Sequence, residues 1–342
     1  MPDVESLLEQ LIDMADETMS SLAGLETRKV SMLDIARIKR NGDKIVMVTA
    51  YDAPSGRLAD QAGIDWVLVG DSAAMTMFGR DSTVTATMDE MLMLTRAVTR
   101  GVQHAFVVAD MPFGSYQVSD TSAIENALRF VKEAGADAVK LEGGGRSVAR
   151  AAAIVASGIP VMGHLGLTPQ SVTQLGGYKA QGRTAEHAAR LCADAVSLER
   201  AGCFSIVLEA IPETVARRIS EKLSIPTIGI GAGAACDGQV LVWHDLLGIS
   251  DEHIPRFVKR YANVADAILC GLRHYAAAVR ASHFPEKCHT YSMPQRELEL
   301  FANMAAAAPT RNEQKQHMSE AEEDVQDVIE GTRAAGIRRT SS

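Results

Sequence analysis

The sequence predicts an α/β protein: a (β/α)8 (TIM) barrel with a short N-terminal helical extension and a poorly ordered C-terminal tail. Two observations favour the barrel. From Ile45 onward, eight short apolar runs alternate with longer helical stretches, which is the pattern of repeated βα units around a parallel sheet. The runs and helices together fit the size of this barrel, about 250 residues. The competing open doubly wound sheet carries G-x-G-x-x-G after its first strand, and that motif is absent here.

The chain begins with residues 1–30, where apolar residues stand at helical spacing among acidic ones and are followed by Ser20, Ser21 and Gly24. This pattern predicts a short, peripheral amphipathic helix and a linker. The eight predicted strands come next, and a helix over residues 254–279 is expected to complete the outer layer. The strands are residues 45–50, 66–70, 105–109, 138–141, 160–163, 205–208, 226–230 and 239–243.

The end of the chain has a different composition. Residues 305–342 hold an alanine run and a stretch rich in Glu, Gln and Lys, with few aromatic or branched apolar residues to bury. We therefore divide the chain into an N-terminal extension (1–30), a catalytic barrel domain (31–290) and a C-terminal tail (291–342) that is expected to be largely disordered. No function is assigned to the tail.

Composition narrows the class of partner. The chain has 342 residues, of which 46% are hydrophobic and 23% charged, and its formal net charge is -9. These values are typical of a soluble globular protein. Without a basic cluster, the acidic balance argues against nucleic acid and against an anionic membrane surface as partners. We expect small-molecule substrates.

The expected compartment is the reducing cytoplasm. The five cysteines are scattered without a C-x-x-C pair, so neither a disulfide framework nor a structural zinc site is predicted. No apolar run approaches the roughly 20 residues of a membrane span. The first thirty residues are acidic rather than rich in arginine, and they resemble neither a secretory signal nor a transit peptide.

Polar residues stand where the predicted strands end, and in such barrels the chemistry lies at the C-terminal ends of the strands. Lys140 and Glu142 are two residues apart on one strand, so they share a face, while Val139 and Leu141 take the other. Five successive strands bring ionisable groups to one rim, which favours a site over a simple Lys140–Glu142 ion pair. The strand-end residues are Asp71, Ser72, Asp110, Lys140, Glu142, His164 and Glu209.

The carboxylates Asp71, Asp110 and Glu142 form an oxygen-rich cluster of the kind that holds Mg²⁺. The alternative is a set of ion pairs with Lys140 and Arg80. A Mg²⁺ ion with open positions can chelate a 2-oxo acid and stabilise its enolate, and Lys140 can supply a further positive charge.

Glu209 follows an apolar run at the end of the sixth strand. Such surroundings tend to raise a carboxyl pKa towards the range of a general base, and proton abstraction beside a carbonyl is the natural role. The alternative is a helix cap, because Pro212 opens a helix just beyond. For His164, substrate orientation and a purely structural role remain equally open.

Two glycine-containing segments raise further expectations. The loop over residues 166–183 is long for a βα connection and suggests a lid or a partner contact. The Gly-Ala-Gly segment at 231–233 allows close backbone approach and suggests a phosphate site, although the glycine pattern alone is a weak signal.

From about Leu33 to Phe284, the chain closely resembles the ketopantoate hydroxymethyltransferase (3-methyl-2-oxobutanoate hydroxymethyltransferase) family. Many ordered motifs over this length carry the resemblance. They are VGDS at 69–72, DST at 81–83, ADMPF at 109–113, KLEGG at 140–144, GHLGLTPQS at 163–171, GGYK at 176–179, VLE at 207–209, IGIGAG at 228–233 and CDGQ at 236–239.

The resemblance implies a (β/α)8 barrel with Mg²⁺ bound through Asp71, Asp110 and Glu142, and with Glu209 as the proton-abstracting base. It also implies substrate contacts for Asp71, Ser72, Asp110 and Lys140. The implied reaction adds a hydroxymethyl group from 5,10-methylenetetrahydrofolate to the enolate of 3-methyl-2-oxobutanoate, giving 2-dehydropantoate for pantothenate biosynthesis. The resemblance also implies a cytoplasmic homo-oligomer, since members of the family are commonly decamers of two pentameric rings.

Some positions depart from the family pattern: Ala73-Ala74 replaces Leu-Gly, Thr85-Ala86 replaces Pro-Val, and Leu94 stands where histidine is common. These departures lie outside the metal and base positions and bear on the preference among 2-oxo acids. Two other functions compete with this one. A Mg²⁺ enzyme of the phosphoenolpyruvate mutase and isocitrate lyase type would usually carry a Lys-Lys-Cys-Gly loop, which is absent. A non-catalytic paralogue would be expected to lack the base or a metal carboxylate, and all are present.

Overall fold

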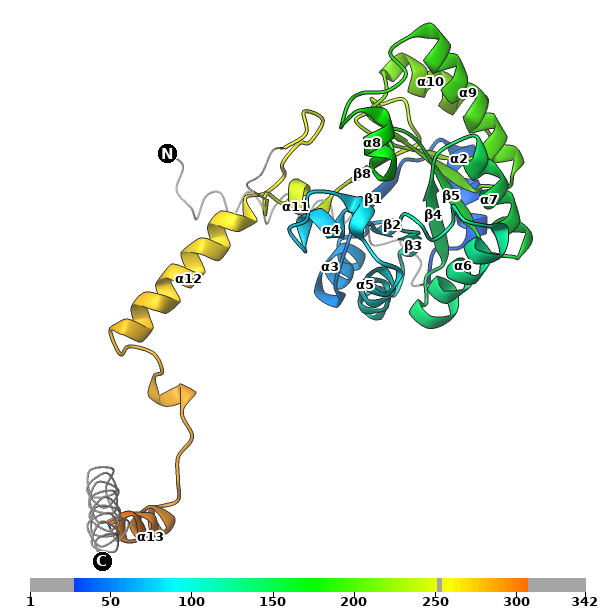
Figure 1. The fold of residues 1–342 in the computed structure, drawn as a ribbon. Coiled ribbons are helices and arrows are strands. Elements are labelled where there is room, and N and C mark those ends of the chain that lie inside the picture. Colours follow the sequence, from blue (N-terminus) through cyan, green and yellow to red (C-terminus); the bar gives the residue numbers. More distant parts are fainter. Residues whose placement is uncertain (1–27, 251–253, 307–342) are drawn as a thin grey trace, which may run out of the picture. The chain divides into compact units, whose positions relative to one another are not determined.

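The computed structural model describes residues 28–250 and 254–306 (Figure 1). The amphipathic helix predicted within residues 1–30 therefore lies almost entirely outside the described residues. The chain divides into two compact units, Met1–Leu269 and Cys270–Ser342, and the barrel belongs to the first. The predicted boundaries at residues 30 and 290 stay predictions.

Eight parallel strands close into a barrel in which β1 pairs with both β2 and β8, so the predicted fold class is confirmed. Because both faces of each strand are covered, the strands read as nearly continuous apolar runs rather than alternating ones. They are β1 (Ile45–Thr49), β2 (Trp66–Val69), β3 (Phe106–Asp110), β4 (Ala138–Glu142), β5 (Val161–Gly166), β6 (Ser205–Glu209), β7 (Thr227–Ile230) and β8 (Gly238–Leu241).

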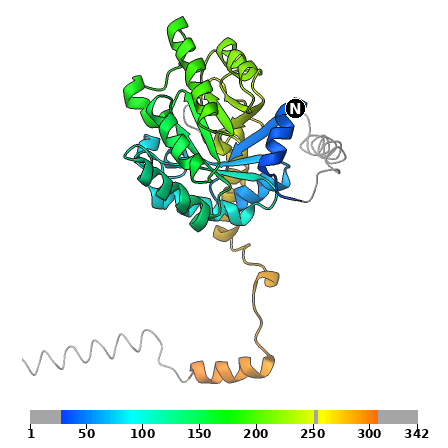
Figure 2. The same ribbon diagram turned by 90° about the vertical axis from the view of Figure 1, so that its right-hand side faces the viewer.

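The helices that follow the strands surround the barrel (Figures 1 and 2). The longer ones expose one face and bury an apolar stripe against the strands, as amphipathic sequences predict. The α-helices of this unit up to residue 246 are α2 (Met32–Asn41), which precedes the first strand, and α3 (Ala53–Gln61), α4 (Ala73–Thr76), α5 (Met88–Gly101), α6 (Asp120–Ala134), α7 (Arg146–Ala156), α8 (Val172–Leu175), α9 (Ala185–Arg200), α10 (Glu213–Lys222) and α11 (Trp243–Leu246).

Two apolar cores hold this unit together. One lies between strands and outer helices and includes Leu92, Phe130 and Ile154. The other lies inside the barrel at the start of the strands, where Trp66 and Phe106 pack and Ile35 of α2 joins them. Helix α2 therefore packs at the N-terminal end of the barrel, which leaves the opposite end for polar groups.

The last predicted strand and helix differ from the structure at their boundaries. Strand β8 ends at Leu241 because Trp243 already opens α11, held by a hydrogen bond from its backbone N to Thr49 Oγ1 (2.9 Å). The helix expected over 254–279 is α12 (Val264–Arg280), and none of its residues is buried. It begins late because the preceding segment returns along α11, where the backbone N of Tyr261 donates to the carbonyl of Leu246 (2.9 Å).

The described part of the second unit is helical. It holds the end of α12, a 3-10 turn (Lys287–His289) and α13 (Gln295–Ala306). Helix α13 lies within the tail for which disorder was expected, and residues 307–342 lie outside the described residues. Within the described ranges, no helix is long and apolar enough to cross a membrane.

Candidate active site

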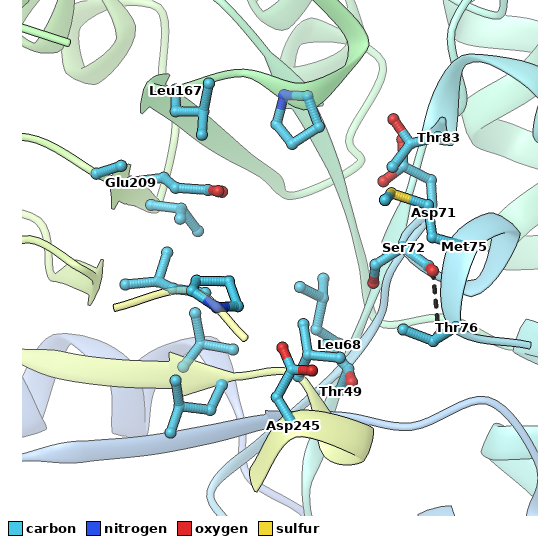
Figure 3. Close-up of a pocket in the computed structure, with 18 of the residues that line it drawn as sticks. Thr49, Leu68, Asp71, Ser72, Met75, Thr76, Thr83, Leu167, Glu209 and Asp245 are labelled. Atoms are coloured by element: carbon cyan, nitrogen blue, oxygen red, sulfur yellow. Dashed lines mark hydrogen bonds between the residues drawn. The ribbon is translucent and has the colours of Figure 1, made fainter. Parts of the chain in front are cut away.

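The predicted site residues meet at the C-terminal end of the barrel, around a cavity of about 920 Å³. Figure 3 shows Glu209 and Asp71 reaching into this cavity from opposite sides. All seven side chains predicted from the strand ends line it: Asp71, Ser72, Asp110, Lys140, Glu142, His164 and Glu209.

Strand register places the buried charges beside one another. Asp110 pairs in register with Lys140, and the Lys140 Nζ lies 2.7 Å from Asp110 Oδ1. The backbone N of Asp71 donates to Asp110 Oδ2 (3.1 Å). Glu142 pairs in register with His164 on the next strand. The expected shared face of Lys140 and Glu142 is therefore present, and it belongs to a larger polar cluster rather than to one isolated pair.

His164 lies between two carboxylates. Its Nδ1 is 3.3 Å from Glu142 Oε1, and its Nε2 is 3.2 Å from Glu209 Oε2. Burial and Lys140 oppose protonation, but contacts with Glu142 and Glu209 outweigh them and raise the pKa of His164 to about 9. Although Lys140 Nζ also lies 3.3 Å from Nδ1, a protonated ring donates from this atom to Glu142 and cannot accept from Lys140.

The cluster carries more negative charge than its cations balance. Burial, and then the neighbouring Asp110 and Glu142, raise the pKa of Asp71 well above its ordinary value. Burial also raises the pKa of Asp110 despite the opposing charge of Lys140. The pKa of Glu142 is lowered because His164 and Lys140 outweigh its burial. Such an excess of buried negative charge favours a bound cation.

This donor set fits Mg²⁺ better than a softer metal. Oxygen donors suit Mg²⁺, which binds through few carboxylates and completes its shell with water and substrate oxygens. In the described ranges, however, no group of three His, Cys, Asp or Glu side chains is arranged to hold a metal ion by itself. Mg²⁺ at this cluster would therefore need water and substrate oxygens to complete its shell. The alternative set of ion pairs is present only in part, since Lys140 pairs with Asp110 but Arg80 pairs with Glu90.

Two residues without an assigned role in the sequence analysis hold the acidic cluster. Gln170 donates from Nε2 to Asp71 Oδ2 (2.9 Å) and from its backbone N to Glu142 Oε2 (3.0 Å). Tyr116 in turn donates its hydroxyl to Gln170 Oε1 (2.6 Å). Gln170 belongs to the GHLGLTPQS motif, which was the one available signal.

Ser72 belongs to a second network, on the β1 side. Its hydroxyl lies 2.9 Å from the hydroxyl of the buried Tyr51, which also accepts from Thr49 Oγ1 (2.9 Å). The carbonyl of Ser72 accepts from Thr76 Oγ1 (3.1 Å), the dashed contact in Figure 3. The Ser72 side chain is thus held at the edge of the cavity.

The position of Glu209 distinguishes between its two predicted roles. Its carboxylate contacts His164, and among the described residues it accepts no hydrogen bond from the first turn of α10, whose N-cap is Pro212, so the helix-cap alternative is not supported. The neighbouring strand fits closely, because a Cβ on Gly166 (φ +100°) would collide with the carbonyl oxygen of Glu209. This geometry requires glycine at residue 166.

The structure bears differently on the predictions made for the two glycine-containing segments. Tyr178, in the loop over 166–183, lines the cavity and its hydroxyl lies 3.6 Å from Met75 Sδ, while the lid itself stays a prediction. Around Gly231, a Cβ would lie 2.6 Å from Phe257 Cδ1, and one on Gly233 would strike Glu213. These glycines therefore admit neighbouring side chains, and a carboxylate beside Gly233 argues against the predicted phosphate site there.

A family model described as Ketopantoate hydroxymethyltransferase matches residues 29–287. The chain belongs to this family. The ketopantoate hydroxymethyltransferase resemblance seen in the motifs is thereby confirmed. The 3-methyl-2-oxobutanoate hydroxymethyltransferase of Moorella thermoacetica is 54% identical over 263 residues, covering 77% of this chain and 98% of that protein. The enzyme of the same name from Thermobifida fusca is 52% identical, covering 79% of this chain and 96% of that protein.

Solved structures are similar in fold. A phosphonopyruvate hydrolase has a TM-score of 0.50 at 14% identity, covering 81% of this chain and 96% of that one. A 2,3-dimethylmalate lyase, a member of the PEP mutase/isocitrate lyase superfamily, has a TM-score of 0.50 at 17% identity, covering 81% and 95%. At such identities, the likeness concerns the barrel alone.

Proposed function

We propose that this protein transfers a hydroxymethyl group from 5,10-methylenetetrahydrofolate to 3-methyl-2-oxobutanoate, giving 2-dehydropantoate for pantothenate biosynthesis. Relatives at 50–54% identity bear the name of this activity. The structural observation that carries the proposal is that the proposed base and the proposed metal-binding carboxylates line opposite sides of one cavity. Glu209 faces the space from one side, and the cluster around Asp71 faces it from the other (Figure 3).

The acidic cluster is the proposed binding end. Asp71, Asp110 and Glu142 would hold Mg²⁺, which supplies charge stabilisation at the carboxylate and keto oxygens of a chelated 2-oxo acid. Lys140 adds a fixed positive charge beside Asp110, where the keto oxygen becomes negative. Ser72, held by Tyr51, offers a hydroxyl to the substrate carboxylate.

Glu209 is the proposed base. It removes the C3 proton, the electron pair moves into the C2–C3 bond, and the carbonyl oxygen gains the charge. The nucleophilic C3 then forms a carbon–carbon bond with the one-carbon unit of methylenetetrahydrofolate, while water supplies the hydroxyl oxygen and tetrahydrofolate leaves. His164, which contacts both Glu142 and Glu209, keeps the base oriented towards the bound acid.

The remaining expectations belong to the same proposal. We infer a cytoplasmic enzyme that works on small molecules as a homo-oligomer, a decamer of two pentameric rings, as the family resemblance implies. Sedimentation of the purified protein tests this assembly. The phosphoenolpyruvate mutase and isocitrate lyase alternative rests on fold similarity at 14–17% identity and is not favoured.

Proton NMR in D2O tests the enolising half of the reaction. The Mg²⁺-loaded protein should wash the C3 proton out of 3-methyl-2-oxobutanoate without folate and form a hydroxymethyl product with it. Glu209→Gln should slow exchange by about 10²–10⁴-fold, the usual contribution of a general base. The matched control is Glu213→Gln, which changes an exposed glutamate on the following helix and should exchange normally.

Two results would contradict this assignment. Exchange retained by Glu209→Gln would remove Glu209 as the base. A folded, Mg²⁺-loaded wild-type protein that shows neither exchange nor product would overturn the proposed function itself.

A further inference from the structure

Two pairs of metal-binding side chains lie outside the barrel, in the second unit. On α12, Cys270 and His274 stand four residues apart and share one face of the helix, and Cys270 Sγ lies 4.0 Å from His274 Nε2. In the 3-10 turn that follows α12, Cys288 Sγ lies 3.5 Å from His289 Nδ1. All four side chains are exposed, and none of them takes part in the proposed barrel chemistry.

The sulfur–nitrogen separations of both pairs suit a zinc ion. Zinc lies about 2.3 Å from a cysteine sulfur and about 2.0–2.1 Å from a histidine nitrogen, so these two ligands of a tetrahedral site are about 3.5 Å apart. The pair Cys288–His289 already has this separation, and the helical pair is within a small side-chain rotation of it. Thiolate and imidazole ligands together favour zinc over a hard ion such as Mg²⁺.

The spacing of the pairs along the chain fits the same ion. Three residues separate Cys270 from His274, and 13 residues separate His274 from Cys288. Zinc-binding sequences commonly place about 12–15 residues between their two ligand pairs, with three to five between the members of a histidine pair. The Cys-x-x-Cys criterion does not cover a site made of two Cys–His pairs, so the sequence alone predicted no zinc here.

Aromatic packing turns the second pair back towards the first. The Phe284 ring lies 5.7 Å from the ring of Tyr275, the neighbour of His274 in the sequence, and 5.2 Å from the ring of His289. In the described ranges, however, neither pair belongs to a group of three His, Cys, Asp or Glu side chains arranged to hold a metal ion. The ion must therefore draw the two pairs together, in the way that metal binding and local folding are coupled in small zinc sites.

We propose that the two pairs bind one zinc ion per chain, in a structural Cys2His2 site outside the barrel. Each thiol binds as a thiolate and releases its proton to solvent, and each imidazole binds in its neutral form. The ion replaces the long hydrogen bond that His289 Nδ1 accepts from the backbone N of Glu286 (3.3 Å). The family match ends at residue 287, so the ion fastens a segment that begins beyond the match to α12.

The absorption spectrum of bound Co²⁺ tests the site. The full-length protein, kept reduced by a phosphine and supplied with excess Mg²⁺ to compete at the barrel carboxylates, is titrated with Co²⁺. The wild type should bind one Co²⁺ per chain with a thiolate charge-transfer band and the d–d bands of a tetrahedral ion, and zinc should displace it. Calorimetry in buffers of different ionisation enthalpy should then show about two protons released for each zinc ion bound.

One cysteine of each pair is then replaced. Cys270→Ser and Cys288→Ser should each abolish the tetrahedral spectrum and weaken zinc binding by more than the roughly 10–100-fold that loss of a mere supporting partner costs. The matched controls change a half-buried cysteine of the barrel unit (Cys192→Ser) and the exposed histidine between the pairs (His283→Gln), and both should bind zinc as the wild type does.

Three results would overturn the inference: a reduced wild type without a thiolate band, tight tetrahedral binding retained by Cys288→Ser, or binding lost in His283→Gln. Because the site lies outside the barrel, C3 exchange should be unchanged in Cys270→Ser and Cys288→Ser. Failure of the zinc site therefore leaves the proposed function intact, whereas failure of the proposed function leaves the cobalt spectrum intact.

Discussion

The two ends of the barrel use the same eight strands for opposite purposes. At the N-terminal end, Trp66, Phe106 and Phe204 fill the interior, with ring centroids 5.6–6.3 Å apart. At the C-terminal end, the interior is a cavity lined by carboxylates. The strands therefore begin with apolar side chains that stabilise the fold. They end with charged side chains whose burial costs stability.

Charge follows the same division. At the N-terminal end, Asp237 is balanced by a base, since Lys39 Nζ lies 2.8 Å from its Oδ2, and it also accepts from Thr227. In the cavity, the three carboxylates Asp71, Asp110 and Glu142 face two cations, Lys140 and His164, and the excess negative charge is buried. The difference shows that burial of a charge indicates function where its balance is incomplete, and structure where the balance is closed.

The largest expected effect separates stability from chemistry. Trp66→Ala removes a fully buried ring from the N-terminal core and should lower the free energy of unfolding by about 3–5 kcal/mol. The C3 exchange rate of the protein that remains folded should be unchanged, because the site lies at the other end. Urea unfolding and exchange by NMR measure the two quantities. A large loss of exchange rate at full folding would mean that the two ends are coupled.

The second largest effect is expected at the C-terminal end, where a change at Asp71 should alter the stability that Mg²⁺ binding adds. Mg²⁺ at about 100 times its Kd should stabilise the wild type by about 2.7 kcal/mol, and Asp71→Asn should lose most of this gain. Without Mg²⁺ the variant should be at least as stable as the wild type, since a crowded, buried carboxylate has been neutralised. Thermal unfolding with and without Mg²⁺ measures both, with Asp43→Asn as control. Full Mg²⁺ stabilisation of Asp71→Asn would remove Asp71 from the metal site.

The smallest effect concerns a balanced charge outside the cavity. Arg80 and then Thr87 hold the pKa of Glu90 at about 2, against an ordinary value of 4.5. Because the folded pKa is depressed, this stabilisation is full above pH 4.5 and disappears as the pH falls towards 2. Glu90→Gln should therefore cost about 1 kcal/mol or less at pH 7, and the deficit should shrink at pH 3.5. A deficit that is the same at both pH values would exclude the charge as its cause.

The sequence predicted the barrel and the seven cavity residues because strand ends carry both signals at once: an apolar run and the polar residue that terminates it. Gln170 and Tyr116 escaped assignment, since their bonds to the acidic cluster depend on how distant loops fold over it. Arg80, named in the ion-pair alternative to the metal site, pairs instead with Glu90 at the start of the next helix.

Gly166 carries a consequence for how this enzyme can vary. Its missing side chain leaves room for the carbonyl oxygen of Glu209 and for Ile211, so any other amino acid would push the strand that bears the base. In a saturation library of residues 166–183, no substitution of Gly166 should leave a functional protein. Gly176, with nothing within 4 Å of its absent Cβ, should accept the residues that tolerate a left-handed backbone. Mutational tolerance along a single loop would thus record which glycine makes room for the base and which only turns the chain.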